Sequence, residues 1–391
     1  MEKLRRLGSS LLPAISVLPV ASLMLGIGQW VHSFQSDSFL AGGLIVLGNF
    51  ILGNISILFA LSVSIGLAKE QDVCLPISAT LAFLIVSNLL KAPYLKEIGL
   101  TTDAVKLDAL EKLNNQFIGI LIGILVAYLY NRFSETKLPK YLAFFEGPRI
   151  VPILTVLATA LLVILLYFVW PFFFSLLVDF GKGISRLGSI GAGLFGLFNR
   201  LLIPTGLHNA LNSVFWFDIA GINDIANFWS SQGEKGIVGM YQAGFFPITM
   251  FGLPGTALAM YRSAPNKNEK IKSLLIANAF TAFLMGVSEP IELLFMFSAP
   301  PLFLLHAGLT GISLFICSFF KWTAGFGFSS GLVDYLLSLK IPIANQPYML
   351  LVVGVGAFFI YYFVFTFFIH KFQLVLFNEQ TETESRNVKR N

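Results

Sequence analysis

Charge is scarce in this sequence. Only 12% of its 391 residues are Asp, Glu, Lys or Arg and 56% are hydrophobic, whereas soluble domains carry roughly 25% charged residues. With 40 Phe and a mean hydropathy of +0.77, there is too little polar side-chain surface to cover a water-soluble body of this size. These values exclude a soluble enzyme, a disordered chain and a collagen-like repeat, and they predict an integral membrane protein.

Cysteine and metal-binding motifs are also scarce. Cys74 and Cys317 both lie in apolar runs, so they form no disulfide framework and are predicted to be small buried hydrophobes. The sequence has no HExxH, Walker A or CxxC motif, so neither a metal nor a cofactor is predicted. The net charge of +5 is modest, and the basic residues stand between apolar runs, which gives nucleic-acid binding no support.

Long stretches without any charged residue dominate the chain. Most of them are long enough to cross ~30 Å of hydrocarbon, which takes about 20 helical residues. We therefore predict an all-α integral membrane protein with roughly ten transmembrane helices, together with re-entrant or broken helical hairpins. The stretches are residues 7–36, 38–68, 73–90, 114–131, 150–178, 201–217, 236–261, 273–288, 293–320 and 341–370.

The positive charge between these stretches predicts their orientation. Lys and Arg concentrate before residue 7 and in residues 132–149, 262–272 and 386–390. Because Lys and Arg are enriched on the cytoplasmic side, these segments and both termini of this multi-pass protein are predicted to be cytoplasmic. A signal peptide is the competing interpretation of the first stretch, but that stretch is longer than a 7–15-residue signal core, so we interpret it as a retained helix.

Composition divides the chain near residue 179. Residues 1–178 contain long apolar runs and are predicted to form an N-terminal scaffold domain. Residues 179–375 contain shorter runs with Pro, Gly, His and Glu, and are predicted to form a second helical domain that begins with an amphipathic interfacial segment, 179–200. Residues 376–391 are polar and without periodicity, which predicts a cytoplasmic tail or linker.

Three interruptions rich in Pro and Gly fall inside apolar runs of the second domain, at residues 199–209, 246–255 and 286–292. Two prolines and two glycines in residues 246–255 predict that no continuous helix runs through that segment. Non-helical backbone at membrane depth persists only where it is buried in protein or lines a wet cavity. The interruptions therefore predict where a binding site lies.

Ionisable side chains beside these interruptions are the candidate site residues. A carboxylate at membrane depth is costly, so Glu289 and Glu292 need a partner, a proton or a function. Glu289 is predicted to be functional, whereas Glu292 is an interfacial residue, a functional residue or a structural partner of Arg200. His208 follows a Pro/Gly break, which favours a functional role over that of a neutral core histidine.

Two other ionisable residues carry less weight. His306 lies in an apolar run without an adjacent break and is predicted to pack or to make an internal hydrogen bond. Asp334 follows the glycine-rich segment 325–331, and a position lining the cavity stays open as the less favoured interpretation. One carboxylate, one imidazole, one guanidinium and several amide or hydroxyl groups suit a neutral polyhydroxylated ligand such as a sugar. The amide and hydroxyl groups are those of Thr205, Asn209, Asn212 and Ser288.

At these positions the sequence resembles the membrane-spanning C component of bacterial phosphoenolpyruvate-dependent sugar phosphotransferase systems, glucose superfamily. Residues 286–292, Gly-Val-Ser-Glu-Pro-Ile-Glu, are similar to the family's Gly-Ile-Thr-Glu-Pro-Ile-Glu signature, with both carboxylates and the proline in place. Residues 203–209 and 244–261 resemble the N-acetylglucosamine branch more than the glucose branch. The other matching segments are 12–21, 200–212 and 304–313, so the resemblance covers nearly the whole chain.

The resemblance implies a homodimer in the bacterial cytoplasmic membrane, with the N-terminal domain at the subunit interface. It implies translocation of a hexose, N-acetylglucosamine before glucose, which leaves as its 6-phosphate. The chain is then the membrane subunit of a sugar phosphotransferase. The resemblance also implies that Glu289 binds sugar hydroxyls and that His208 and Arg200 lie at the site; Asn209, Thr205 and Ser288 complete the substrate-binding candidates.

In such a system the phosphoryl group comes from a cysteine of a B component, which is supplied by an A component and a histidine phosphocarrier protein. The attacking sugar hydroxyl loses a proton, so Glu289 or His208 acts as the base. Glu289 is favoured as the anchor and His208 as a hydrogen-bonding residue near that hydroxyl, while Arg200 attracts the phosphoryl group or neutralises a carboxylate. Neither Cys74 nor Cys317 suits a phosphocysteine, so we expect the donor to be a separate chain or a part absent from this sequence.

Two other functions remain open at this stage. An ion-coupled or facilitative sugar permease would also have broken helices and a buried glutamate, but it would release unmodified sugar. A membrane sugar sensor would bind sugar without transporting it. The chemical form of the sugar inside the cell separates the first alternative from a phosphotransferase, and the absence of flux identifies the second.

Overall fold

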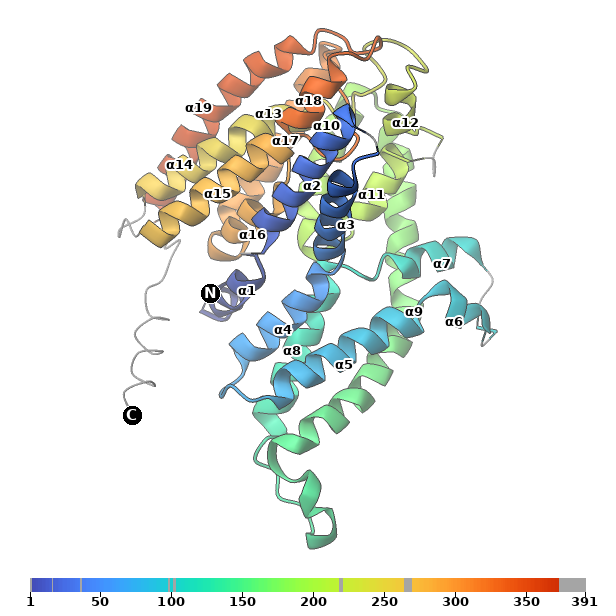
Figure 1. The fold of residues 1–391 in the computed structure, drawn as a ribbon, viewed down its shortest axis with the longest axis vertical. Coiled ribbons are helices and arrows are strands. Elements are labelled where there is room, and N and C mark those ends of the chain that lie inside the picture. The colour runs from blue at the N-terminus through green and yellow to red at the C-terminus, as the bar shows by residue number, and fades with distance from the viewer. Residues whose placement is uncertain are drawn as a thin grey trace.

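Helices make up the described part of the chain (Figure 1). The computed structural model describes residues 2–372, except 16, 36, 98, 101–102, 218–220 and 264–268. Within these residues there is no strand, only an isolated bridge between Thr323 and Asn345. The prediction of an all-α chain is confirmed.

The first half of the chain supplies the lower part of the molecule in Figure 1, where α4, α5, α8 and α9 pack together. Helices α2 and α3 pair with each other and lie in the upper part, where α2 contacts α15. The helices of this half are α1 (Glu2–Ile15), α2 (Leu18–Phe34), α3 (Phe39–Gly53), α4 (Ile55–Leu67), α5 (Cys74–Leu89), α6 (Ala92–Glu97), α7 (Ala104–Glu111), α8 (Gln116–Phe133) and α9 (Ile150–Ser185).

The second half forms the upper part, where α10 packs along α17 and α14 along α19. Its helices are α10 (Ser189–Leu201), α11 (His208–Phe215), α12 (Asp224–Trp229), α13 (Phe245–Pro247), α14 (Leu253–Ser263), α15 (Glu269–Met285), α16 (Glu289–Ser298), α17 (Pro300–Phe319), α18 (Leu332–Ser338) and α19 (Tyr348–Lys371). The boundary placed near residue 179 falls inside α9, and residues 179–200 are divided between the end of α9 and α10.

Four of the described helices are long and apolar enough to cross a membrane, and a fifth candidate is a pair of helices bent by 41° at residues 52–54. The prediction of about ten spans is therefore not confirmed. Several charge-free stretches form shorter helices instead, such as the 16 residues of α5 and the 8 residues of α11. The four candidates are Gln116–Phe133, Gly147–Ser185, Pro300–Phe319 and Tyr348–Lys371.

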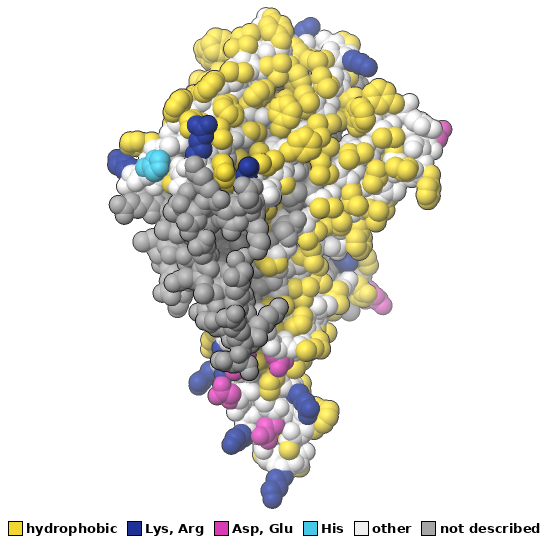
Figure 2. Space-filling view, turned by 60° about the vertical axis from the view of Figure 1, so that its left-hand side comes forward, with side chains coloured by type: hydrophobic (Ala, Val, Ile, Leu, Met, Phe, Trp, Pro, Cys, Tyr) yellow, Lys and Arg dark blue, Asp and Glu magenta, His cyan; other side chains and the backbone are white. Residues whose placement is uncertain are grey.

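The surface agrees with a membrane protein. Apolar side chains dominate the upper part of the face drawn in Figure 2, and many side chains of α9 and α19 are exposed, including Phe168 at 67% and Phe363 at 62%. Charged side chains gather at the lower end, where the connection between α8 and α9 carries Lys137, Lys140 and Arg149. In water, exposure of such an apolar surface would be strongly unfavourable. In a bilayer the same side chains contact acyl chains that are equally apolar, so the cost does not arise.

Two of the three predicted interruptions break the helices as expected. Helix α10 ends at Leu201, and Gly206 adopts a left-handed φ of 69° before α11 begins at His208. A Cβ on Gly206 would lie 2.6 Å from Cγ of Asn115, so only glycine fits this turn. Helix α15 ends at Met285, and Gly286, with a φ of 77°, leads into α16.

The predicted break in residues 246–255 is wrong, because residues 245–263 remain helical throughout. The short α13 continues through a π-helical segment, Ile248–Gly252, into α14. The wider π turn relaxes the i to i−4 hydrogen bonding that Pro would otherwise break, and Pro254 lies in the first turn of α14. Residues Phe245–Met250 are buried, so this segment forms a wall of the protein interior.

Candidate functional site

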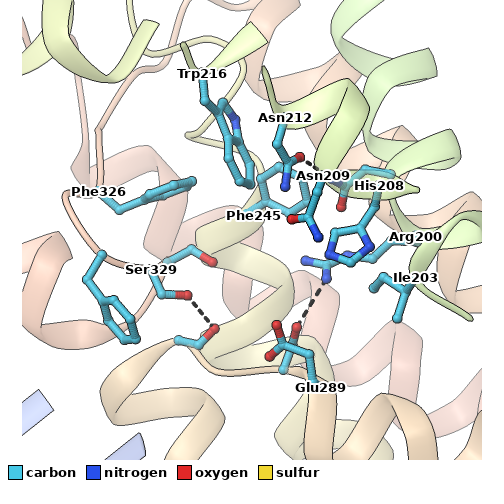
Figure 3. A pocket seen from close by; sticks show the side chains of 15 residues that line it. Arg200, Ile203, His208, Asn209, Asn212, Trp216, Phe245, Glu289, Phe326 and Ser329 are labelled. Carbon is cyan, nitrogen blue, oxygen red and sulfur yellow. Dashed lines mark hydrogen bonds between the residues drawn. The ribbon is translucent and has the colours of Figure 1, made fainter. Parts of the chain in front are cut away.

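The two confirmed interruptions meet at a cavity of about 240 Å³ (Figure 3). In Figure 3, Arg200, His208 and Asn209 lie on one side of it, Phe326 and Ser329 on the other, and Glu289 at its lower edge. The polar lining residues are Asn199, Arg200, His208, Asn209, Asn212, Ser288, Glu289, Ser329 and Ser330. The others are Ile203, Trp216, Phe245, Gly286, Phe326 and Phe328.

Most side chains singled out from the sequence are brought together here. Thr205 does not line the cavity, because its hydroxyl donates to the Leu202 carbonyl at 2.8 Å and accepts from the Leu207 amide at 3.3 Å, which stabilises the turn before α11. Asp334 also lies outside the lining. The candidates that line the cavity are Arg200, His208, Asn209, Asn212, Ser288 and Glu289.

Arg200 is held by a buried ion pair. Its Nη1 lies 3.0 Å from Oε1 of Glu292 and 3.1 Å from Oγ of Ser288, and its guanidinium carbon lies 4.8 Å from the centre of the Phe245 ring. Glu292 is completely buried and does not line the cavity. Of the roles predicted for Glu292, the structural partner of Arg200 is the one observed.

His306 makes internal hydrogen bonds, as predicted. Its Nε2 lies 3.0 Å from Glu292 and its Nδ1 2.9 Å from the hydroxyl of Tyr361. The cavity histidine, His208, differs: its buried Nδ1 has no hydrogen-bond partner within the described residues, and the same holds for Nε of Arg200. Buried polar atoms without partners are uncommon in native proteins, and here two of them belong to side chains that line the same cavity.

Glu289 lies where several helices begin. It is the first residue of α16, and it also lines a second cavity of about 190 Å³. That cavity is lined by Leu18, Ile55 and Gln116, the first residues of α2, α4 and α8. Four helices therefore begin around this cavity, and helix N-termini carry a partial positive charge, which favours a carboxylate nearby.

The segment opposite Glu289 is fixed by buried polar contacts. Asp334 accepts hydrogen bonds from the backbone amides of Phe328 at 2.9 Å and Ser329 at 2.8 Å. Thr249, in the π-helical segment, hydrogen-bonds Ser330. Asp334 therefore serves the cavity by holding its wall, not by facing it.

A second buried carboxylate orders the same wall further along. Asp224 accepts from the side chain of Gln242 at 2.9 Å, and the other end of Gln242 accepts from the amide of Phe326 at 3.0 Å. Four aromatic rings, those of Trp216, Phe245, Phe326 and Phe328, contribute to the cavity lining. Aromatic faces combined with hydrogen-bonding groups are typical of pockets that bind a ring with apolar C–H and polar O–H groups.

The wall also depends on close contact between two backbones. A Cβ on Gly331 would lie 2.3 Å from the amide nitrogen of Gly286, so the two segments touch through glycine. We expect Gly331→Ala to lower the free energy of unfolding by about 1–3 kcal/mol, as overpacking does, and to displace Ser329 from the cavity. Unfolding of the purified protein in detergent measures the effect.

The matched control for this substitution is Gly356→Ala on α19. A Cβ on Gly356 meets no atom within 4 Å, so this variant should unfold within about 0.5 kcal/mol of the unsubstituted protein. Equal stability of the two variants would show that the Gly286–Gly331 contact is not tight.

The spacing of Gly327-Phe-Ser-Ser-Gly331 also matches the G-x-S-x-G pattern of serine hydrolases. The hydroxyl of Ser329 donates to the carbonyl of Gly286 at 2.8 Å rather than to a histidine. That pattern needs a turn between a strand and a helix, and the described residues contain no strand. The site therefore gives hydrolysis no support.

Comparison with known proteins identifies the family. The model of the phosphotransferase system EIIC family matches residues 8–311. The chain belongs to this family of membrane components. As an EIIC protein it is a sugar permease component of a phosphotransferase system, which confirms the resemblance drawn from residues 286–292.

Similar proteins carry the EIIC part alone or joined to other parts. The chain is 39% identical to the N-acetylglucosamine-specific EIICB component of Bacillus subtilis over 93% of its own length and 75% of that protein's. It is 36% identical to the N-acetylglucosamine-specific EIIC component of Streptomyces coelicolor, over 98% of its own length and 94% of that protein's. It is 34% identical to the glucose-specific EIICBA component of Staphylococcus saprophyticus, over 95% of its own length and 59% of that protein's.

Proposed function

We propose that this EIIC protein translocates N-acetylglucosamine across a bacterial cytoplasmic membrane and presents it for 6-phosphorylation by a phosphocysteine of a B component. The support for the sugar is the higher identity to the two relatives named for N-acetylglucosamine than to the one named for glucose. The observation that carries the chemistry is the cavity that joins Arg200, His208 and Glu289 with four aromatic rings.

Each charged or titratable side chain has a part in this reaction. The Glu289 carboxylate accepts hydrogen bonds from sugar hydroxyls, which are donors at the edge of the ring. His208 faces the hydroxyl that attacks phosphorus, and it or Glu289 takes the proton that this hydroxyl loses. Arg200 offers its guanidinium to the phosphoryl oxygens, whose charge a planar, permanently charged fork matches well. The remaining candidates, Asn209 and Ser288, bind further hydroxyls.

The proposal extends to partners and orientation. The B component is a separate chain or a further part, and it receives its phosphoryl group from an A component and a histidine phosphocarrier protein. Both termini and the basic connection between α8 and α9 face the cytoplasm, in line with the positive-inside rule. Residues 1–178 form the scaffold and the interface of a homodimer, residues 179–375 the sugar-binding transport domain, and residues 376–391 the cytoplasmic tail.

Phosphorylation in solution tests this proposal. Purified protein in detergent is mixed with a phosphorylated B component and either radiolabelled N-acetylglucosamine or glucose. We expect sugar 6-phosphate only when the donor is present, with kcat/KM for N-acetylglucosamine roughly 10-fold or more above that for glucose. A preference for glucose would move the chain to the other branch, and sugar bound without any phosphorylation would support a permease or a sensor.

A further inference from the structure

A buried chain of four side chains leads away from the cavity at Arg200. Oε1 of Glu292 lies 3.0 Å from Nη1 of Arg200 and 3.0 Å from Nε2 of His306, whose Nδ1 lies 2.9 Å from the Tyr361 hydroxyl. Arg200 is 7% exposed, and the other three are exposed by 1% or less. Helices α10, α16, α17 and α19 supply one residue each, and only Arg200 lines the cavity.

The partners fix the direction of each hydrogen bond. A carboxylate can only accept, so Nε2 of His306 carries its proton and donates to Glu292. In a neutral imidazole the other nitrogen is an acceptor, so the Tyr361 hydroxyl donates to Nδ1 at 2.9 Å, a shorter contact than the 3.4 Å from the same hydroxyl to the His306 carbonyl. One tautomer of His306 therefore satisfies both neighbours, and it holds Glu292 from the side opposite Arg200.

This arrangement determines how Glu292 meets Arg200. Carboxylates frequently bind a guanidinium through two of its nitrogens at once. Here Oε1 of Glu292 is shared with His306, and both carboxylate oxygens approach a single nitrogen of Arg200, Nη1. Nε of Arg200 has no partner within the described residues. The guanidinium is thus anchored at one nitrogen, which leaves donors for a ligand.

We propose that His306 and Tyr361 are positioning residues for phosphotransfer, because they hold Glu292 in the orientation that keeps the remaining N–H groups of Arg200 available to the phosphoryl oxygens. This inference rests on the proposed function. Because Glu289 anchors the sugar and Arg200 meets the phosphoryl group, loss of the support from His306 slows transfer and leaves sugar affinity nearly unchanged.

The first test removes one hydroxyl. Tyr361→Phe keeps the ring and deletes only the donor to His306. We expect kcat for sugar phosphorylation to fall about 10-fold, since small displacements of a positioning group slow catalysis strongly, while KM for the sugar stays within about 2-fold. The matched control is Tyr362→Phe, which removes the same atom from the next residue, where it accepts from Arg262 at 3.0 Å; its kcat should not change.

The second test asks whether the effect passes through Arg200. Lys at position 200 keeps the charge but has no fork to orient. If the chain acts through Arg200, adding Tyr361→Phe to Arg200→Lys lowers kcat by less than about 2-fold. An equal loss in both backgrounds would overturn the inference, as would unchanged kcat in Tyr361→Phe alone.

A third measurement needs no activity and therefore separates this inference from the proposed function. Nitrogen NMR of the histidine-labelled protein, with the His306 signals assigned by their loss in His306→Gln, reports which ring nitrogen carries the proton. We expect protonation at Nε2, with loss of the single tautomer in Tyr361→Phe. A proton on Nδ1 would contradict the chain even if the unsubstituted protein phosphorylates its sugar.

Discussion

Phosphorylation of N-acetylglucosamine is expected to fall at least about 100-fold in Glu289→Gln, because a charged hydrogen bond to the sugar and a candidate base are lost together. The amide has nearly the same shape as the carboxylate, so the helix N-termini around it remain packed. The variant should therefore insert into membranes and unfold near the same temperature as the unsubstituted protein. Initial rates with saturating phosphorylated B component measure the effect.

The matched control is the same substitution at Glu135. That carboxylate pairs with Lys69 at the surface connection after α8, far from the cavity in sequence and exposed. Surface ion pairs contribute about 0–1 kcal/mol, so Glu135→Gln should retain full activity. Full activity of Glu289→Gln would show that the sugar does not bind at Glu289 and that its site lies elsewhere in the chain.

The largest loss of stability is expected for Glu292→Ala. Removal of this carboxylate leaves the buried guanidinium of Arg200 with Ser288 as its remaining hydrogen-bond partner and takes the acceptor from Nε2 of His306. Breaking a buried ion pair by deleting one partner costs about 3–5 kcal/mol. Denaturant unfolding in detergent should show this loss, and phosphorylation should fall with it.

A conservative replacement separates charge from shape at this position. Glu292→Gln keeps an acceptor for His306 and fills the same space, so its loss of stability should be smaller than that of Glu292→Ala. If the two variants unfold alike and close to the unsubstituted protein, then the pair with Arg200 does not stabilise the fold.

The centre of the site could be predicted from the sequence because charge is expensive at membrane depth. In a chain with 12% charged residues, Glu289 and Arg200 stand out beside Pro and Gly breaks, and the breaks themselves persist only around a cavity. The same reasoning singled out His208 and gave the pairing of Glu292 with Arg200 as one of three interpretations of that carboxylate. These residues could be identified because placing a charge at membrane depth costs free energy, and not by pattern matching alone.

The rest of the lining had no comparable signal. Phe245, Phe326 and Phe328 are three of 40 phenylalanines, and nothing in their spacing separates them from lipid-facing or packing residues. Asp224 and Gln242 are far in sequence from Phe326, whose amide Gln242 binds. Only the tertiary fold brings these residues together. These residues belong to the site through packing, which local sequence does not report.

The count of spans is not confirmed and the predicted break in residues 246–255 is wrong, for related reasons. Charge-free length bounds how long a helix can be but not where it ends: residues 7–36 are divided between α1 and α2, and residues 273–288 end with α15 at Met285. Prolines were expected to break the segment, yet the π-helical turn at Ile248–Gly252 accommodates them without interrupting the helix. Local rules for Pro apply to α-helical hydrogen bonding and not to this wider turn.

Uptake into sealed vesicles tests the central claim most directly. Right-side-out vesicles that carry the protein, prepared with or without the soluble phosphotransferase components and phosphoenolpyruvate enclosed, are given external radiolabelled N-acetylglucosamine, and the internal label is separated by chromatography. We expect internal N-acetylglucosamine 6-phosphate that appears only with the complete donor system. Free sugar accumulating inside without the donors would contradict the account and identify a permease.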